Sequence, residues 1–301
     1  MTGRDLAARL GPVGVWTFAL ERRPIGEERE ALAELEDLGF PAVWIPEGRG
    51  SKEILSHAAL LLPAARRLVL ATGIASIWAR DPVAMATGAR TLGEAFPGRF
   101  VLGIGVSHRT TVDRRGATRY QRPYERMVGY LDAMEEAGYP VRPTPDLPPI
   151  VLAALGPRML RLAAERTAGA HPYFVPVEHT ARARGVLGPE PFLGPEQAVV
   201  LEADAARARE VARGYMSHYL KLENYSRNLL RLGWTDEDLA GGASDRLVDA
   251  IVAWGDAEAI RGRVREHLDA GADHVSLQVL VADPLAMPLP ELRELAPALL
   301  E

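Results

Sequence analysis

Short apolar runs, each followed by an amphipathic segment, recur along nearly the whole 301-residue chain. Runs such as LVLATGIAS (68–76) and FVLGIGV (100–106) show no alternation of polar and apolar residues, which is typical of strands buried on both faces of a parallel sheet. The segment between them begins with Asp81-Pro82, a pair that suits the N-cap and first position of a helix. The pattern therefore predicts an α/β fold of repeated βα units.

Eight of the apolar runs are expected to be strands, at 13–20, 42–48, 68–76, 100–106, 149–155, 169–175, 196–204 and 274–280. Eight βα units close most naturally into a (β/α)8 TIM barrel, and an open doubly wound sheet is the alternative. Residues 223–255 interrupt the alternation, so we expect a helical insertion before the last strand. No linker or low-complexity stretch divides residues 1–301, which we interpret as a single barrel domain.

Composition excludes several classes of function. The absence of cysteine removes disulfides, thiolate metal ligands and cysteine nucleophiles, and the seven histidines form no HxH or HExxH pattern, so no metal site is expected. A net charge of −5 gives no reason to expect a nucleic-acid or membrane partner. No run approaches the roughly 20 apolar residues of a membrane-spanning helix, and no secretory signal pattern is present, which favours a cytoplasmic location.

In a TIM barrel, functional groups lie where the strands end at the carboxyl face. The polar residues expected there are Thr17, Glu47, Thr72, Ser76, Ser107, His108 and Glu202. This set contains no pair of carboxylates at adjacent strand ends and no lysine, which speaks against a glycosidase or a Schiff-base aldolase.

Two strand ends carry glycines. The fourth run ends in Gly103-Ile104-Gly105, but His108 stands where a dinucleotide fingerprint needs its third glycine, so we interpret these glycines as room for a flat group near the backbone. The fifth run ends in LGPR (155–158) and opens a helix, whose free N–H groups would attract an anion. A plain βα turn is an equally good interpretation. Arginines in 109–122 form either an anion-binding loop or a solvated charged loop: Arg109, Arg114, Arg115, Arg119 and Arg122.

A longer stretch resembles a known family. LVLATGIASIWARDPVAMATGARTLGEAFPGRFVLGIGVS, preceded by LGFPAVWIPEG and followed by LAALGPRMLRLAAERTAGAHPYFVPVEHT, is similar to the luciferase-like monooxygenase superfamily, and within it to the F420-dependent oxidoreductases of actinobacteria. The likeness extends over roughly 12–280. It implies a homodimer that transfers a hydride between coenzyme F420 and an unidentified small organic substrate. The alternatives are an FMN-dependent monooxygenase that uses reduced flavin, and a non-catalytic cofactor-binding protein. The arginine-rich loop favours F420, whose tail is anionic.

The resemblance also implies where the cofactor binds. In this family the third strand ends in a bulge with a non-prolyl cis peptide that backs the flat cofactor ring, and the matching bond here is Gly73–Ile74. The end of the fourth strand lies beside the ring, and the phosphate is expected at the helix that begins at Pro157. The residues expected to bind the cofactor are Glu47, Gly73, Ile74, Ala75, Gly105, Val106, Ser107, Leu155, Gly156, Pro157, Arg158 and Phe174.

The substrate side of the site departs from the family. Members that act on sugar phosphates or alcohols carry an Asp-His pair after the second strand, where this chain has Glu47-Gly48. His108 stands where the sugar-phosphate enzymes have a catalytic glutamate, and Lys52 and Lys221 match none of the lysines that bind a phosphate-bearing substrate. We expect His108 to be the catalytic proton donor or acceptor, because imidazole titrates near neutral pH. A histidine that only hydrogen-bonds the cofactor or a loop is the alternative.

Overall fold

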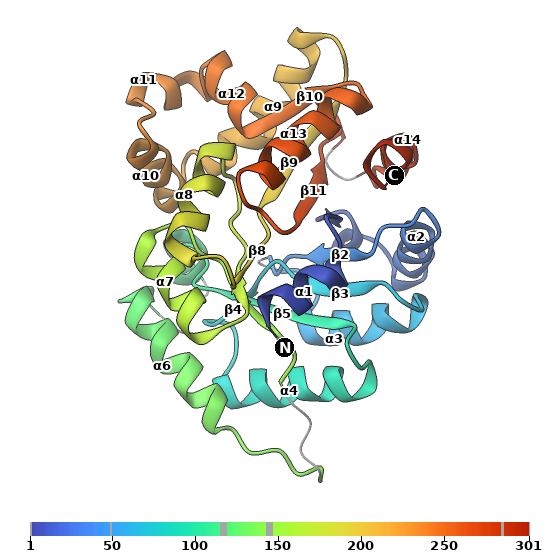
Figure 1. Cartoon of the computed structure of the whole chain (residues 1–301), viewed down its shortest axis with the longest axis vertical. Coiled ribbons are helices and arrows are strands. Elements are labelled where there is room, and N and C mark those ends of the chain that lie inside the picture. The colour runs from blue at the N-terminus through green and yellow to red at the C-terminus, as the bar shows by residue number, and fades with distance from the viewer. Residues whose placement is uncertain (1, 49, 115–118, 143–146, 284–285, 301) are drawn as a thin grey trace.

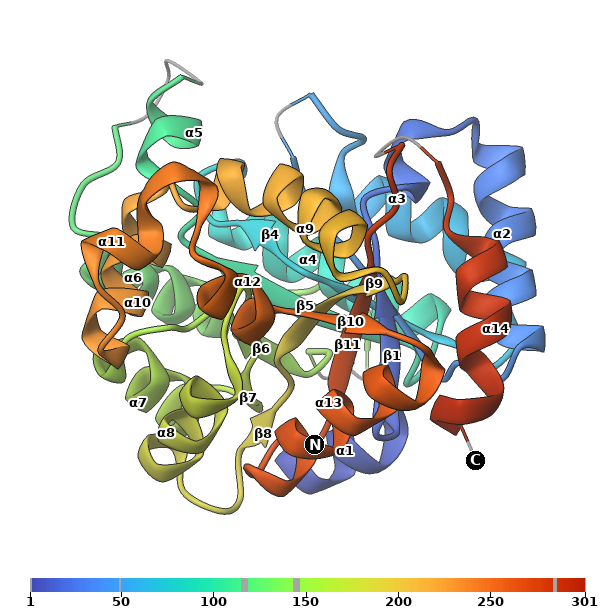
Figure 2. The ribbon, with the colours of Figure 1, turned by 90° about the horizontal axis from the view of Figure 1, so that it is seen from above.

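The computed structural model describes residues 2–48, 50–114, 119–142, 147–283 and 286–300. Within them the apolar runs form one parallel sheet, which confirms an α/β fold with a curled sheet (Figures 1 and 2). Its strands are β1 (Val13–Trp16), β2 (Ala42–Ile45), β3 (Val69–Thr72), β4 (Ala75–Ser76), β5 (Phe100–Gly105), β6 (Ile150–Leu152), β7 (Gly169–Ala170), β8 (Phe192–Leu193), β9 (Glu196–Leu201), β10 (Val252–Gly255) and β11 (Val275–Val279). Most of these residues are buried, which explains why the runs are apolar throughout.

The strand order shows how the sheet curls. Neighbouring strands follow the path β10-β9-β11-β1-β2-β3-β5-β6-β7-β8, with β4 paired to β5. Only Gly194 and Pro195 separate β8 from β9 in the chain, although the two strands are far apart along this path. The N–H of Gly194 donates to Ala170 O (3.0 Å) on the β7 side, and Leu193 O accepts from Asp273 N (2.8 Å) on the β11 side. The two ends of the path therefore approach each other at this segment.

Helices lie around the outside of the sheet (Figures 1 and 2). They are α1 (Gly3–Leu10), α2 (Ile25–Asp37), α3 (Ile54–Leu61), α4 (Pro82–Ala95), α5 (Arg109–Asp113), α6 (Pro123–Glu136), α7 (Pro157–Arg166), α8 (Val177–Leu187), α9 (Ala205–Tyr219), α10 (Glu223–Leu232), α11 (Asp236–Leu239), α12 (Asp245–Ile251), α13 (Ala257–Asp269) and α14 (Leu289–Leu300). The carboxylate of Asp81 accepts hydrogen bonds from the N–H groups of Val83 and Ala84, which confirms the predicted start of α4. In the part of the chain that the structure describes, no helix is both long and apolar enough to cross a membrane.

The segment 223–255 differs from the helical insertion that the sequence predicts. Its first part holds α10, α11 and α12, but Val252–Gly255 is the strand β10, which pairs in parallel with β9. Periodicity did not separate this strand from α12, because the short apolar run VAWG follows DRLVDAI without a turn signal. The short strand β8 was not predicted either. The prediction of a parallel α/β sheet is confirmed, whereas the expected arrangement of eight strands plus a helical insertion is not.

Aromatic and histidine side chains fill the interior below the strand ends. The rings of Trp44 and His171 stack at 4.2 Å, and Trp44 Nε1 donates to His274 Nε2 (3.1 Å). Burial lowers the pKa of both histidines to about 4, so both are neutral near pH 7. The strand ends above them therefore rest on a packed, uncharged layer.

Candidate functional site

The end of β3 forms the bulge that the resemblance implies. The Gly73–Ile74 peptide bond is cis, as predicted. A Cβ atom on Gly73 would lie 2.5 Å from Trp16 Nε1, and one on Gly103 would lie 1.9 Å from Thr72 O, so neither position has room for a side chain. Thr72 Oγ1 donates to Gly103 O (2.7 Å). The bulge is thus pressed between β1 and β5, with only glycine at the points of closest approach.

His108 follows the end of β5. Its ring is half-buried, Nδ1 donates to Asn224 Oδ1 (2.9 Å), and the ring of Tyr225 lies 5.3 Å away. Burial lowers the pKa of His108 below its usual value, and the nearby His218 lowers it further, while the bond to Asn224 opposes both effects. Since Nδ1 carries the hydrogen, the neutral ring presents Nε2 as an acceptor. Ser107, next to it, has a left-handed backbone with φ of 53°.

Helix α10 supplies residues that the sequence analysis missed. Asn224, Asn228 and Arg231 are spaced by three and four positions, so they share one face of the helix with Tyr225 beside them. This face meets His108 at one end and the start of α7 at the other. The sequence predicts a helical insertion over 223–255, but its polar residues gave no reason to assign it to the site, although the spacing of these residues on one helix face was a usable signal.

The start of α7 offers unpaired donors. Gly156 is its N-cap and gives no side-chain cap, so the N–H groups of the first turn lack intrahelical acceptors. Both terminal nitrogens of Arg231 lie within 3.9 Å of the point where a Cβ of Gly156 would stand. Asn228 is 3% exposed, and its Nδ2 has no partner in the described part of the chain. Arg231 donates to Asn228 Oδ1 (3.4 Å), so a positive charge beside the helix start adjoins a buried amide with an unused donor. This arrangement suits a phosphate-like anion.

The arginines near this turn have other contacts. Arg158 is exposed, lies 4.1 Å from the centre of the Tyr124 ring and pairs loosely with Glu125 (3.6 Å). Arg109, in the predicted arginine-rich loop, stacks over Tyr120 at 5.3 Å. Arg114, Arg119 and Arg122 are exposed, and Arg115 lies outside the described residues. An anion-binding role for this loop stays a prediction.

Glu47 stabilises the bulge through hydrogen bonds to the residues that follow it. One of its carboxylate oxygens accepts from Ser76 N (2.7 Å), and both accept from Arg80 (2.6 and 3.1 Å), which also pairs with Glu53 (2.9 Å). Glu47 and Arg80 are both nearly buried. The carboxylate therefore fastens the end of β4 to the segment leading into α4, and its hydrogen-bonding capacity is largely used within the protein.

Aromatic side chains form the wall on the β7 side. Phe174 is buried, has a left-handed backbone with φ of 57°, and donates its N–H to Glu196 Oε2 (3.0 Å). Its ring packs against that of Tyr219 at 5.2 Å. The neighbouring Tyr173 lies 4.9 Å from Trp16, the residue that touches the bulge. This wall therefore connects the bulge with the face of α10.

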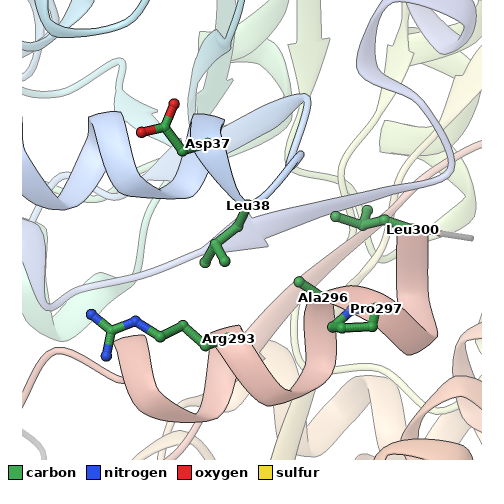
Figure 3. A pocket seen from close by; sticks show the side chains of 6 residues that line it. All are labelled: Asp37, Leu38, Arg293, Ala296, Pro297 and Leu300. Atoms are coloured by element: carbon green, nitrogen blue, oxygen red, sulfur yellow. The ribbon is translucent and has the colours of Figure 1, made fainter.

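Two other places do not belong to this site. Glu202, at the end of β9, pairs with Arg207 (2.9 Å) on the protein surface. A surface hollow between α2 and α14 is lined by Asp37, Leu38, Arg293, Ala296, Pro297 and Leu300 (Figure 3). It shares no residue with the strand-end site. Among the described residues, no group of three or more His, Asp or Glu side chains is placed to hold a metal ion.

Two relatives match part of the chain. A stretch of 182 residues is 30% identical to a protein of Mycobacterium tuberculosis named as a coenzyme F420-dependent oxidoreductase, and it covers 60% of this chain and 48% of that relative. A stretch of 146 residues is 29% identical to the 5,10-methylenetetrahydromethanopterin reductase of Archaeoglobus fulgidus, and it covers 43% of this chain and 44% of that relative. The chain thus spans less than half the length of either relative.

Solved structures and a family model match nearly the whole chain. An F420-dependent secondary alcohol dehydrogenase in complex with an F420–acetone adduct superimposes with a TM-score of 0.74 at 16% identity, covering 96% of this chain and 98% of that one. The FMN complex of the oxygenating constituent of 3,6-diketocamphane monooxygenase from Pseudomonas putida superimposes at 0.69 and 16% identity, covering 95% of each. Both neighbours show the fold alone. The model of the family described as luciferase-like monooxygenase matches residues 12–274, and the chain belongs to this family.

Proposed function

We propose that this protein is an F420-dependent oxidoreductase that acts on a small organic substrate. The observation that carries the proposal is the pairing of two features: a bulge at the end of β3, packed between β1 and β5, where the family resemblance implies the cofactor ring, and a donor-rich helix start suited to a phosphate. The relative named for F420 and the F420-bound neighbour favour this cofactor. When bound, F420 supplies the hydride chemistry, and the protein supplies binding, orientation and proton transfer.

Residues at four strand ends would hold the cofactor. Gly73, Ile74 and Ala75 would back the ring, Gly105, Val106 and Ser107 would flank it, and Phe174 would close the side toward β7. Leu155, Gly156, Pro157 and Arg158 would meet the phosphate. The unpartnered Nδ2 of Asn228 supports this fit, because a buried amide without an acceptor is costly unless a ligand satisfies it. Arg231 would add a charge-assisted contact.

His108 would act on the substrate side as proton donor or acceptor. Asn224 fixes its tautomer through Nδ1, which leaves Nε2 to exchange the proton. Glu47 would serve the cofactor indirectly, since its carboxylate holds Ser76 N and Arg80 and thereby the shape of the bulge.

An FMN-dependent monooxygenase is the second candidate, and the FMN-bound neighbour favours it. Titrating the purified protein with F420 and with FMN, each followed by fluorescence, separates the two. We expect F420 to bind at micromolar concentration or below and FMN to bind more weakly. The opposite order would select the monooxygenase, and a failure of both to bind would contradict both enzymes. Tight F420 binding without turnover on any substrate class would select the non-catalytic cofactor-binding protein.

We also propose a (β/α)8 arrangement for residues 1–301 and a homodimer in the cytoplasm. Residues 192–196 form hydrogen bonds with strands at both ends of the strand path, which supports a closed barrel. In that barrel β8 and β9 would act as one strand, and β10 would pair with β9 as an additional strand. Light scattering on the protein as it elutes from a size-exclusion column would test the dimer. A measured mass equal to that of one chain at micromolar concentration would contradict it.

A further inference from the structure

Glu196 is a buried acid with half of its hydrogen-bonding capacity unused. The residue starts β9 and is 1% exposed. Oε2 accepts the N–H of Phe174 (3.0 Å), whereas Oε1 has no partner in the described part of the chain. A carboxylate this deep with one neutral donor would be strongly destabilising. A neutral carboxyl group, which brings a hydrogen of its own, fits the place better.

A chain of tyrosine hydroxyls leads away from this carboxyl group. Tyr173 donates to Gln278 Oε1 (2.7 Å), and its oxygen lies 3.1 Å from the Tyr215 hydroxyl and 2.9 Å from the Tyr219 hydroxyl. An amide oxygen only accepts, so the single hydrogen of Tyr173 goes to Gln278, and Tyr215 and Tyr219 must both donate to Tyr173.

The hydrogen count then assigns the proton on Glu196. Tyr215 faces the carboxyl group but spends its own hydrogen on Tyr173, which leaves Glu196 Oε1 without a donor. The lone pairs of Tyr215 are free to accept instead. A hydrogen on Oε1 pointing to Tyr215 satisfies both atoms at once.

The surroundings of Glu196 favour the neutral form. The titratable groups around it are tyrosines: Tyr173 after β7, Tyr215 and Tyr219 on α9, and Tyr225 on α10. The charged Arg22 and Glu21 act on Tyr219 instead. Burial raises the pKa of Glu196 to about 8. In the ionised state Phe174 N and a Tyr215 hydroxyl turned away from Tyr173 would both donate to the carboxylate, and these bonds offset only part of the rise.

We propose that Glu196 stores a proton for the candidate site and releases it through Tyr215 to Tyr173. Tyr173 is the outlet, because it is partly exposed and packs against Trp16 beside the bulge. The O–H bond of Glu196 breaks as Tyr215 gains that hydrogen, and Tyr215 passes its own hydrogen to Tyr173. Tyr173 gives up its bond to Gln278 and passes its own hydrogen to an acceptor oxygen of a bound molecule. Each tyrosine ends neutral, and Glu196 ends as a carboxylate that accepts from Phe174 N and Tyr215. Solvent then returns the proton. The store is a property of the protein alone; its use in turnover rests on the proposed function.

Infrared difference spectra of the cofactor-free protein between mildly acidic and alkaline pH test the store. We expect the carbonyl stretch of one protonated carboxyl group to disappear with a midpoint near pH 8. The band should be absent in Glu196→Gln, a variant that keeps an acceptor oxygen for Phe174 N. It should be unchanged in Glu202→Gln, the control, because Glu202 follows the other end of β9. Tyr215→Phe should shift the midpoint upward, because the carboxylate loses a donor. A band that Glu196→Gln leaves intact, or a midpoint at the usual value for a glutamate, would overturn the proposal.

The relay needs a kinetic test. After a rapid pH jump, the carboxyl band should decay more slowly in Tyr215→Phe and Tyr173→Phe than in the unaltered protein, because each removes one hydroxyl of the route. Equal decay rates in all three proteins would show that the proton leaves by another path. This measurement uses no cofactor, so its outcome is independent of whether F420 binds.

Discussion

At the scale of single residues, two neutral side chains carry the proposed proton chemistry, and the sequence pointed to only one of them. His108 was identified because it follows a strand end, where polarity is unusual. Glu196 was invisible, because EQAVVLEAD shows a glutamate at the edge of a strand, where exposure is the usual expectation. Its burial depends on how Tyr215 of α9 and the left-handed turn at Phe174 pack against it, and neither contact follows from a local pattern.

Replacing His108 tests its role directly. His108→Asn should retain F420 affinity and lower turnover by roughly 10²–10⁴, the usual contribution of a general acid or base. Because burial lowers the pKa of His108, an inflection in the pH dependence of cofactor binding is expected below pH 6.5 and should vanish in the variant. Weaker binding with unchanged turnover at saturation would instead assign a structural role.

Glu196 should make folding stability depend on pH. Its folded-state pKa of about 8 exceeds the usual value of 4.5, so the folded protein binds the extra proton between these values. Stability from this group is therefore complete below about pH 4.5 and is lost as pH rises toward 8, at roughly 1.4 kcal/mol for each pH unit. Urea unfolding across this range should show the decline in the unaltered protein and a flatter profile in Glu196→Gln. Parallel profiles would contradict a raised pKa.

At the scale of elements, α10 shows why the site was only half predictable. The strand ends and the start of α7 follow from local patterns, and the Gly73–Ile74 bond and Asp81 cap were predicted correctly. The contacts of α10 with His108 and Gly156 join segments far apart in the chain, which no local pattern encodes. The strand β10 was missed for a related reason, since only its pairing with β9 separates it from α12.

Two arginines on α10 provide a matched pair for testing the phosphate site. Arg231 lies beside Gly156, whereas Arg227 pairs with Glu223 within the helix. Arg231→Ala should weaken F420 binding by about ten- to a hundredfold, since a hydrogen bond to a charged group contributes about 1.5–3 kcal/mol. Arg227→Ala should leave the affinity within error, as measured by the same fluorescence titration. Equal losses in both variants would show that Arg231 acts only through the general charge of the helix.

At the scale of the whole molecule, the candidate site depends on the curled sheet bringing distant segments together. The bulge, the end of β5 and the start of α7 come from residues 73–160, whereas α10 comes from residues 223–232. The hollow between α2 and α14 is lined by residues that belong to none of these four segments (Figure 3). One ligand that contacts all four segments should therefore reduce their local opening together.

Hydrogen–deuterium exchange with and without F420 tests this joint ordering. We expect slower exchange at 73–76, 105–108, 156–160 and 223–232 on binding, because each segment loses local opening when the ligand bridges them. Residues 289–300 at the hollow serve as an internal control and should not change. Protection that is confined to the first three segments would show that α10 covers the site without binding the ligand, and it would also remove the proposed role of Arg231. Protection of all four, lost at 223–232 alone in Arg231→Ala, would show that α10 is fastened through the phosphate end of the ligand.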